Sequence, residues 1–113
     1  MSASDLARPG ASVCEGAESF ALRVLGDDMA PEFNAGDIII VEPGGAVHDG
    51  SFVLAWHGGE WFFRQLHRAG GTWVLRALAA GCAELPLDSL DAVRGVVIQK
   101  AVPGRRRLSR FYV

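Results

Sequence analysis

Turns rich in glycine interrupt this chain at short intervals, and their spacing constrains the fold more than any other feature. Glycine supplies 14 of the 113 residues, roughly twice its average share of ~7%. Between these turns the apolar residues alternate or cluster in short segments, and no segment keeps a helical period for more than two turns. Short apolar segments separated by closely spaced turns are typical of all-β domains. We therefore predict one mainly β domain without long helices.

Strands are predicted where apolar residues alternate or where β-branched residues run together. Residues 20–24 alternate in polarity, which predicts a strand with one buried face. The unbroken apolar run at 38–41 predicts a strand covered on both faces. Gly-Gly pairs join three further strands into a meander, and one more strand closes the domain. These remaining predicted strands are 52–56, 60–68, 72–78 and 91–102.

The predicted domain occupies residues 20–102. Residues 1–19 are small and polar and predict a flexible N-terminal arm, whereas residues 103–113 predict a basic C-terminal tail. Inside the domain we expect one short helical turn at 29–33 and an irregular segment at 79–89.

Composition excludes several classes of protein. Half of the residues are hydrophobic and the net charge is -2, which argues against a disordered chain and against binding nucleic acid by overall charge. No stretch reaches the ~18 apolar residues of a membrane-spanning helix, and residues 1–9 lack the pattern of a secretory signal. Cys14 and Cys82 are too few for a disulfide framework and lack metal-ligand spacing. We expect a cytoplasmic protein that binds no cofactor, no metal and no membrane.

The order of short motifs after the first strand is more informative than the composition. The strand runs into Gly26-Asp27-Asp28-Met29, and a short turn then leads through Gly36-Asp37 to the β-branched run. The segments 49–55, 60–66 and 92–99 follow with matching gaps. This order resembles the self-cleaving serine peptidase domain shared by LexA, UmuD and phage repressors. The resemblance implies a signal-peptidase-like fold of curved antiparallel sheets with a long β-hairpin.

Two residues carry the chemistry in that family. A serine stands in the loop after the first strand, directly before a methionine, and a lysine stands on the second strand of the hairpin. Burial lowers the lysine pKa until its neutral amine takes the serine proton. The serine then attacks a peptide bond in the protein's own N-terminal arm or in a partner.

This sequence departs from the family at both positions. Asp28 precedes Met29 where the serine is expected, and Arg64 occupies the lysine position on the hairpin strand. Aspartate has no hydroxyl, and arginine does not lose its proton in proteins. The arm also lacks the Ala-Gly or Cys-Gly bond that the family cleaves, since Cys14 precedes Glu15. We therefore expect a catalytically inactive member of the family.

Asp28 and Arg64 are expected to lie side by side in place of the catalytic pair. A carboxylate and a guanidinium in that position can form a bidentate ion pair that closes the former active site. Removing one partner of a well-buried pair costs about 3–5 kcal/mol. We therefore expect Asp28→Ala to destabilise the domain more than Asp28→Ala combined with Arg64→Met.

The other titratable residues in turns are interpreted as structural. Three histidines lack the spacing of a zinc site and are expected at the surface, namely His48, His57 and His67. Asp37 belongs to the Gly-Asp turn, and Arg64 beside Asp28 argues against a bound cation. No metal is therefore expected at Asp27, Asp28 or Asp37.

Trp56, Trp61 and Trp73 fall on consecutive predicted strands. Aromatic residues on neighbouring strands usually pair across a sheet and cover its core, and the alternative is an exposed surface for a partner. Cys14 and Cys82 are interpreted as ordinary residues of the arm and of a loop.

The tail carries a cluster of four arginines, Arg105, Arg106, Arg107 and Arg110. A solvated tail is the preferred interpretation. One alternative is sequence-independent binding of phosphates, which the net negative charge of the rest of the chain opposes. Another is that residues 107–113 add a strand to a neighbouring molecule's sheet. The second alternative agrees with the resemblance, because family members dimerise through their C-terminal region.

The resemblance implies a role in bacterial or phage transcription regulation or in the SOS response. A domain that has lost self-cleavage is expected to act as a dimerisation or protein-interaction module. Its expected partners are a second copy, a related repressor or an error-prone polymerase subunit. Direct DNA binding is not expected without a helix-turn-helix domain.

Two alternative functions belong to different classes. An active peptidase with a rearranged site would need Ser19, Ser51 or Cys14 as its nucleophile. Its base would not be Lys100, the only lysine, which lies at the far end of the last predicted strand. A nucleic-acid accessory protein would instead use the arginine-rich tail.

Overall fold

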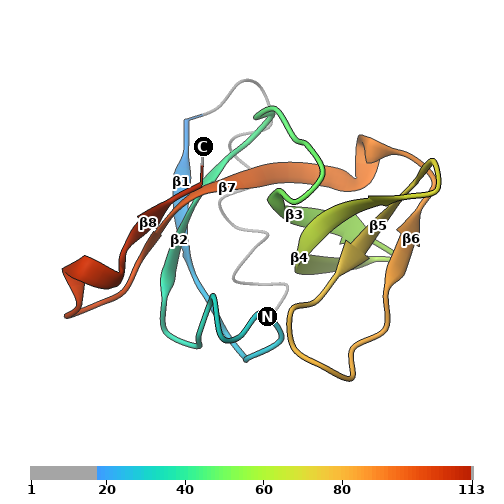
Figure 1. The fold of residues 1–113 in the computed structure, drawn as a ribbon. Coiled ribbons are helices and arrows are strands. Elements are labelled where there is room, and N and C mark those ends of the chain that lie inside the picture. Colours follow the sequence, from blue (N-terminus) through green and yellow to red (C-terminus); the bar gives the residue numbers. More distant parts are fainter. Residues whose placement is uncertain (1–17, 113) are drawn as a thin grey trace.

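The computed structural model describes residues 18–112, which form one eight-stranded antiparallel sheet (Figure 1). The hydrogen-bonded order is β1-β2-β7-β3-β4-β5-β6, and β8 pairs with β7. The strands are β1 (Phe20–Arg23), β2 (Ile38–Glu42), β3 (Phe52–His57), β4 (Glu60–Ala69), β5 (Thr72–Arg76), β6 (Leu85–Leu87), β7 (Val93–Ala101) and β8 (Arg110–Phe111). Residues 18–112 include two short 3-10 turns, η1 (Leu90–Ala92) and η2 (Arg106–Leu108), and no α-helix. The prediction of a mainly β domain is confirmed.

The predicted meander corresponds to β3, β4 and β5. Both Gly-Gly pairs form its turns, and their four glycines have φ values between +59° and +85°. Other residues rarely adopt this conformation, so the glycines fix where each hairpin turns. The predicted helical turn at 29–33 is wrong: the Phe33 N–H donates a hydrogen bond of 2.9 Å to the Met29 carbonyl, but the segment is a non-helical turn with a cis peptide bond between Ala30 and Pro31.

Two strands lie where the sequence predicts none. β6 falls inside the segment 79–89, and β8 falls inside the predicted tail. β6 has only three residues and contains Pro86, which is tolerated there because β6 forms a sheet edge. β8 pairs with β7 of the same chain, aligning Phe111 with Gln99. Residues that were assigned to the tail therefore belong to the sheet.

The burial predicted for residues 38–41 is wrong for one face of β2. Ile39 and Val41 are completely buried, whereas Ile38 and Ile40 are only partly covered. β2 lies next to the edge strand β1, and both strands cover the core with one face. The β-branched run therefore reflects a preference for extended backbone, not burial on both sides.

β7 joins the two halves of the sheet. One of its edges pairs with β2, and the other pairs first with β3 and then with β8. Two register shifts mark β-bulges, which increase the local twist, and Figure 1 shows β7 curving across the molecule. Gly95 permits the close approach of β2, since a Cβ there would lie 2.5 Å from the Val41 Cγ1.

The core consists of two clusters of buried residues on opposite faces of the β3–β4 hairpin. Successive residues of a strand point to opposite faces, so Leu54 enters the first cluster and Val53 enters the second. The first core cluster contains Leu22, Val24, Met29, Phe33, Ile39, Val41, Leu54, Phe63 and Val97. The second core cluster contains Val53, Ala55, Leu66, Leu75 and Leu87.

Candidate functional site

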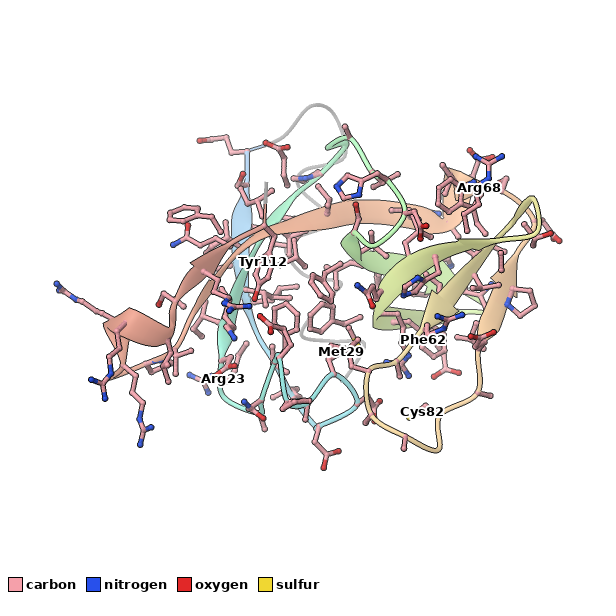
Figure 2. All side chains as sticks on the ribbon, in the orientation of Figure 1. Arg23, Met29, Phe62, Arg68, Cys82 and Tyr112 are labelled. Carbon is pink, nitrogen blue, oxygen red and sulfur yellow. The ribbon has the colours of Figure 1, made fainter. Side chains whose placement is uncertain are left out.

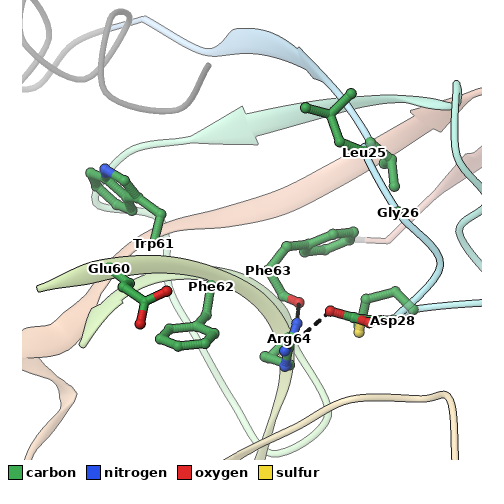
Figure 3. A pocket seen from close by; sticks show the side chains of 10 residues that line it. Leu25, Gly26, Asp28, Glu60, Trp61, Phe62, Phe63 and Arg64 are labelled. Carbon is green, nitrogen blue, oxygen red and sulfur yellow. Dashed lines mark hydrogen bonds and ion pairs between the residues drawn. The ribbon is translucent and has the colours of Figure 1, made fainter. Parts of the chain in front are cut away.

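An open pocket of about 160 Å³ lies between the loop that follows β1 and the first half of β4 (Figure 3). Its charged lining residues are Asp28, Glu60 and Arg64. The rest of the lining is Val24, Leu25, Gly26, Met29, Trp61, Phe62 and Phe63. Gly26 has a φ of +91°, a value that favours glycine, and the chain turns there before it reaches Asp28.

Asp28 and Arg64 meet at one wall of this pocket, although 36 positions separate them in the sequence. Arg64 Nη2 lies 3.3 Å from Asp28 Oδ2 (Figure 3). The structure therefore brings together the two residues that the sequence predicts as neighbours.

Arg64 is well fixed in this position. Its side chain is 13% exposed, and its Nη1 donates a hydrogen bond of 2.9 Å to the Phe63 carbonyl. Its Cζ lies 5.3 Å from the centre of the Phe62 ring, within the range of a cation–π contact. The buried Nε has no hydrogen-bond partner. The Nε–H of Arg64 is thus a buried donor without an acceptor in the wall of the pocket.

The predicted bidentate geometry is wrong. Nη1 is engaged by the Phe63 carbonyl and Nε lacks a partner, so only Nη2 reaches the carboxylate of Asp28. The Asp28 side chain is 52% exposed, and therefore the pair is not well buried on the carboxylate side.

Asp28 also contacts the segment that precedes β6. The Ala79 N–H donates a hydrogen bond of 2.9 Å to the Asp28 carbonyl, and the Cys82 Sγ lies 4.0 Å from Asp28 Oδ1.

The pocket lining contains neither a nucleophile of the serine, threonine or cysteine type nor a lysine or histidine base. Among residues 18–112, no hydroxyl group belongs to this lining, and the Cys82 Sγ near Asp28 lies outside it. What the pocket does offer is apolar surface, one ion pair and the carboxylate of Glu60.

Half of β4 presents an unpaired edge beside the pocket. β4 pairs with β3 along residues 60–65, but it pairs with β5 only along residues 65–69. Residues 60–64 therefore have no strand on their second side within residues 18–112. An exposed strand edge of this kind can accept an extended segment from another chain.

These motifs and this geometry agree with one peptidase family. A family model described as Peptidase S24-like matches residues 4–98, most of the chain. The chain belongs to the Peptidase S24-like family. This finding confirms the resemblance to the LexA and UmuD domains, and the all-antiparallel sheet of the S24 domain agrees with it. A comparison with curated proteins gives no match.

The nucleophiles of the alternative peptidase site lie elsewhere in the S24 domain. Ser51 is 6% exposed, and its Oγ accepts a hydrogen bond of 2.9 Å from the His48 N–H. Ser19 is exposed just before β1. Cys14 lies outside the described residues. Neither Ser19 nor Ser51 is among the described residues that line the pocket.

Lys100 belongs to a polar cluster that sequence reasoning missed. It is buried on β7, and its Nζ contacts both the carbonyl and the carboxylate of Glu32. The hydroxyl of Tyr112 donates to the same carboxylate, and Arg110 Nη1 lies 3.3 Å from it. These contacts, which we call the Glu32 cluster, fasten β8 to the 29–33 turn.

The Glu32 cluster alters two ionisation equilibria. Burial raises the pKa of the Glu32 carboxyl, but the Tyr112 hydroxyl and the charges of Lys100 and Arg110 outweigh burial and leave that pKa below its ordinary value. Burial and the bond to Glu32 raise the pKa of Tyr112. The cluster is therefore built around an ionised Glu32 and a neutral Tyr112.

Several other predicted residues have structural contacts. Asp37 is buried and its Oδ2 accepts from the Asn34 N–H at 2.9 Å, which confirms its role in the turn. Trp56 and Trp61 pair across β3 and β4 with ring centres 5.2 Å apart, as predicted, but Trp56 is 38% exposed and only Trp61 packs against the first core cluster. Trp73 packs against the second core cluster.

The histidines contact groups near the β2–β3 loop or stay at the surface. His48 is exposed, and His57 is partly exposed. His67 Nδ1 lies 3.4 Å from Asp49 Oδ1. Within residues 18–112, no three histidine, cysteine, aspartate or glutamate side chains gather to hold a metal ion. No helix in that part of the chain could span a membrane.

Proposed function

We propose that this S24 domain is a non-catalytic dimerisation or protein-interaction module in bacterial or phage transcription regulation or in the SOS response. In this proposal Asp28 and Arg64 replace the serine and lysine of the family's self-cleavage pair. The observation that carries the proposal is the Asp28–Arg64 ion pair, which occupies the wall of a pocket whose described lining holds no serine, threonine, cysteine, lysine or histidine.

The inactivity follows from chemistry at the two positions. Transfer of a proton from a serine requires a neutral amine, and arginine stays charged at any pH at which the domain folds. Asp28 pairs with that charge and has no hydroxyl to activate. The protein is expected in the cytoplasm, where repressors and polymerases of this class act.

A role in protein interaction is supported by the surface beside the ion pair. The unpaired edge of β4 at residues 60–64 offers backbone donors and acceptors, and Leu25, Trp61 and Phe62 offer apolar contacts next to it. A peptide strand bound there would be retained and not cut. The proposed partners are a second copy, a related repressor or a polymerase subunit.

Intact-mass spectrometry tests the absence of catalysis. The purified chain is incubated at neutral and at alkaline pH, and the expected result is an unchanged mass under both conditions. A fragment whose release is faster at alkaline pH would contradict the proposal. It would instead support a rearranged site that uses Ser19, Ser51 or Cys14.

Affinity capture from the native cell tests the interaction, before and after DNA damage, with Trp61→Ser as the control bait. We expect wild-type bait to retain a repressor, a polymerase subunit or a second copy, and we expect the variant to retain less. Recovery of the same proteins by both baits would show that the pocket side of β4 is not the docking surface.

A further inference from the structure

The charges of this protein are separated between its body and its C-terminal hairpin. The hairpin comprises the end of β7, η2 and β8, and four of the eleven basic residues lie in its residues 104–113, which contain no acidic residue. The rest of the sequence contains the other seven basic residues and all thirteen acidic residues. The net charge of -2 is therefore the sum of a basic C-terminal hairpin, which we call the projection, and an acidic remainder of the chain.

Three consecutive arginines stand at the start of η2. Arg105, Arg106 and Arg107 are exposed, and none forms an ion pair with another residue of the range 18–112. Figure 2 shows nitrogen-ended side chains spreading from the turn between β7 and β8, away from the body.

The position of the projection is fixed by the Glu32 cluster. Arg110 and Tyr112 bind the Glu32 carboxylate, and the Val102 N–H donates to the Ser109 Oγ at 3.3 Å across the base of the turn. Arg105 and the two arginines of η2 are thus presented by a paired hairpin and not by a solvated tail. Ordered presentation reduces the conformational entropy that binding would otherwise cost.

An exposed aromatic ring lies on the same hairpin as the arginines. Phe111 on β8 directly follows Arg110. It is 75% exposed, the highest value among the large apolar residues of the described chain. Guanidinium groups bind phosphates with parallel hydrogen bonds, and aromatic rings stack on unpaired bases. A duplex offers the phosphates, but its bases are stacked on each other and are closed to the ring.

We propose that the β7–β8 hairpin binds single-stranded nucleic acid, with Arg105, Arg106 and Arg107 on the phosphates and Phe111 stacked on a base. This activity goes beyond the proposed protein-interaction role and uses a different face from the Asp28–Arg64 pocket. An anionic membrane is the less suitable partner, because the described part of the hairpin exposes only two large apolar side chains, Leu108 and Phe111, which do not make an apolar face.

Fluorescence anisotropy with a labelled oligothymidylate of ~20 nucleotides and with the corresponding duplex tests the proposal. Three phosphate contacts predict a slope of log K against log salt of about -2 for a single strand, so binding weakens about 20-fold between about 50 and 200 mM salt. The triple variant Arg105→Gln/Arg106→Gln/Arg107→Gln should make this slope less negative by about 2, so that its binding hardly depends on salt. Phe111→Ala should weaken binding to the single strand about tenfold and leave the duplex unaffected.

The matched control, Arg23→Gln/Arg68→Gln/Arg94→Gln, changes the net charge equally at exposed positions outside the hairpin. It should bind the oligonucleotide as the wild type does. Equal losses in the two triple variants would overturn the proposal, because overall charge would then explain the binding. Absence of binding at low salt would overturn it, and so would binding to phosphatidylserine vesicles without binding to the oligonucleotide. Unchanged circular dichroism spectra establish that every variant is folded.

Discussion

At the scale of single residues, the two members of the Asp28–Arg64 pair differ in how firmly they are placed. Arg64 is 13% exposed and also contacts the Phe63 carbonyl and the Phe62 ring, whereas the Asp28 side chain is 52% exposed. Ion pairs with one solvated partner contribute about 0–1 kcal/mol, because water screens the attraction. The pair therefore changes the chemistry of the pocket more than the stability of the fold.

Asp28→Ala is expected to lower the free energy of unfolding by less than about 1 kcal/mol, because the carboxylate is half solvated. Adding Arg64→Met should restore the free energy of unfolding, because this second substitution removes the buried guanidinium that Asp28→Ala leaves without a counter-charge. Urea denaturation of the wild type, the two single variants and the double variant measures the coupling. A loss of about 3 kcal/mol for Asp28→Ala would show a buried pair, and a double-variant loss equal to the sum of the two single losses would show no coupling.

Glu32→Gln is expected to cost about 3–5 kcal/mol, because it leaves the buried ammonium of Lys100 without its counter-charge. The folded-state pKa of Glu32 lies below its ordinary value of 4.5, so its contribution is complete above that value. The contribution is lost as the pH falls through the lowered folded-state pKa.

Urea midpoints at neutral and acidic pH measure this dependence. The wild type should lose more stability on acidification than Glu32→Gln does. Tyr112→Phe, which keeps the ring and removes the hydroxyl, should cost less than Glu32→Gln and retain much of the acid sensitivity. The same acid sensitivity in the wild type and in Glu32→Gln would contradict the role given to this carboxylate.

At the scale of elements, β7 decides how the sheet closes. It pairs with β2, β3 and β8, and its bulges turn it from one core cluster toward the other. Gly95 stands at the crossing with β2, where its missing side chain leaves room for Val41.

Gly95→Ala is expected to destabilise the domain by about 1–3 kcal/mol, because the new methyl group would overlap the buried side chain of Val41. Val41→Ala alone also destabilises by leaving a cavity. The double variant should lose clearly less than the sum of the two single losses, as measured by thermal and urea denaturation. Strict additivity would show that the close approach at Gly95 does not limit the packing.

The strands that the sequence predicts are those with a local signal. Glycine pairs and alternating apolar residues identify the β3–β4–β5 meander, and a β-branched run identifies β2. β6 and β8 have three and two residues, too few for a period, and their pairing depends on strands far along the chain. Whether one or both faces of β2 are covered depends on its neighbours in the sheet and not on its own residues.

The candidate site was predictable only in part for the same reason. The resemblance to a family pointed to Asp28 and Arg64, 36 positions apart, but the one-donor geometry follows from contacts with Phe62 and Phe63 that no pattern encodes. The Glu32 cluster joins residues 68 to 80 positions apart, and each of its members is unremarkable in its own segment.

At the scale of the whole molecule, two core clusters share the β3–β4 hairpin. Leu54 and Phe63 face one cluster while Val53 and Leu66 face the other, so neither cluster can be lost without exposing strands that form the other. A small domain arranged in this way is expected to unfold as one unit.

Phe33→Ala in the first core cluster and Leu75→Ala in the second are expected to cost about 3–5 and 2–5 kcal/mol. Each should shift one common transition, with far-ultraviolet circular dichroism and tryptophan fluorescence following the same curve. Two separate transitions, with only one moved by each variant, would show that the clusters unfold independently.

The proposed loss of catalysis at the Asp28–Arg64 pair is tested most directly by labelling with a fluorophosphonate probe, which reacts with activated serines. The wild type is expected to remain unlabelled, and the double variant Asp28→Ser/Arg64→Lys is expected to be labelled at position 28, with neither single variant reacting. Labelling of the wild type, or a double variant that stays inert while folded, would contradict the assignment of these two positions.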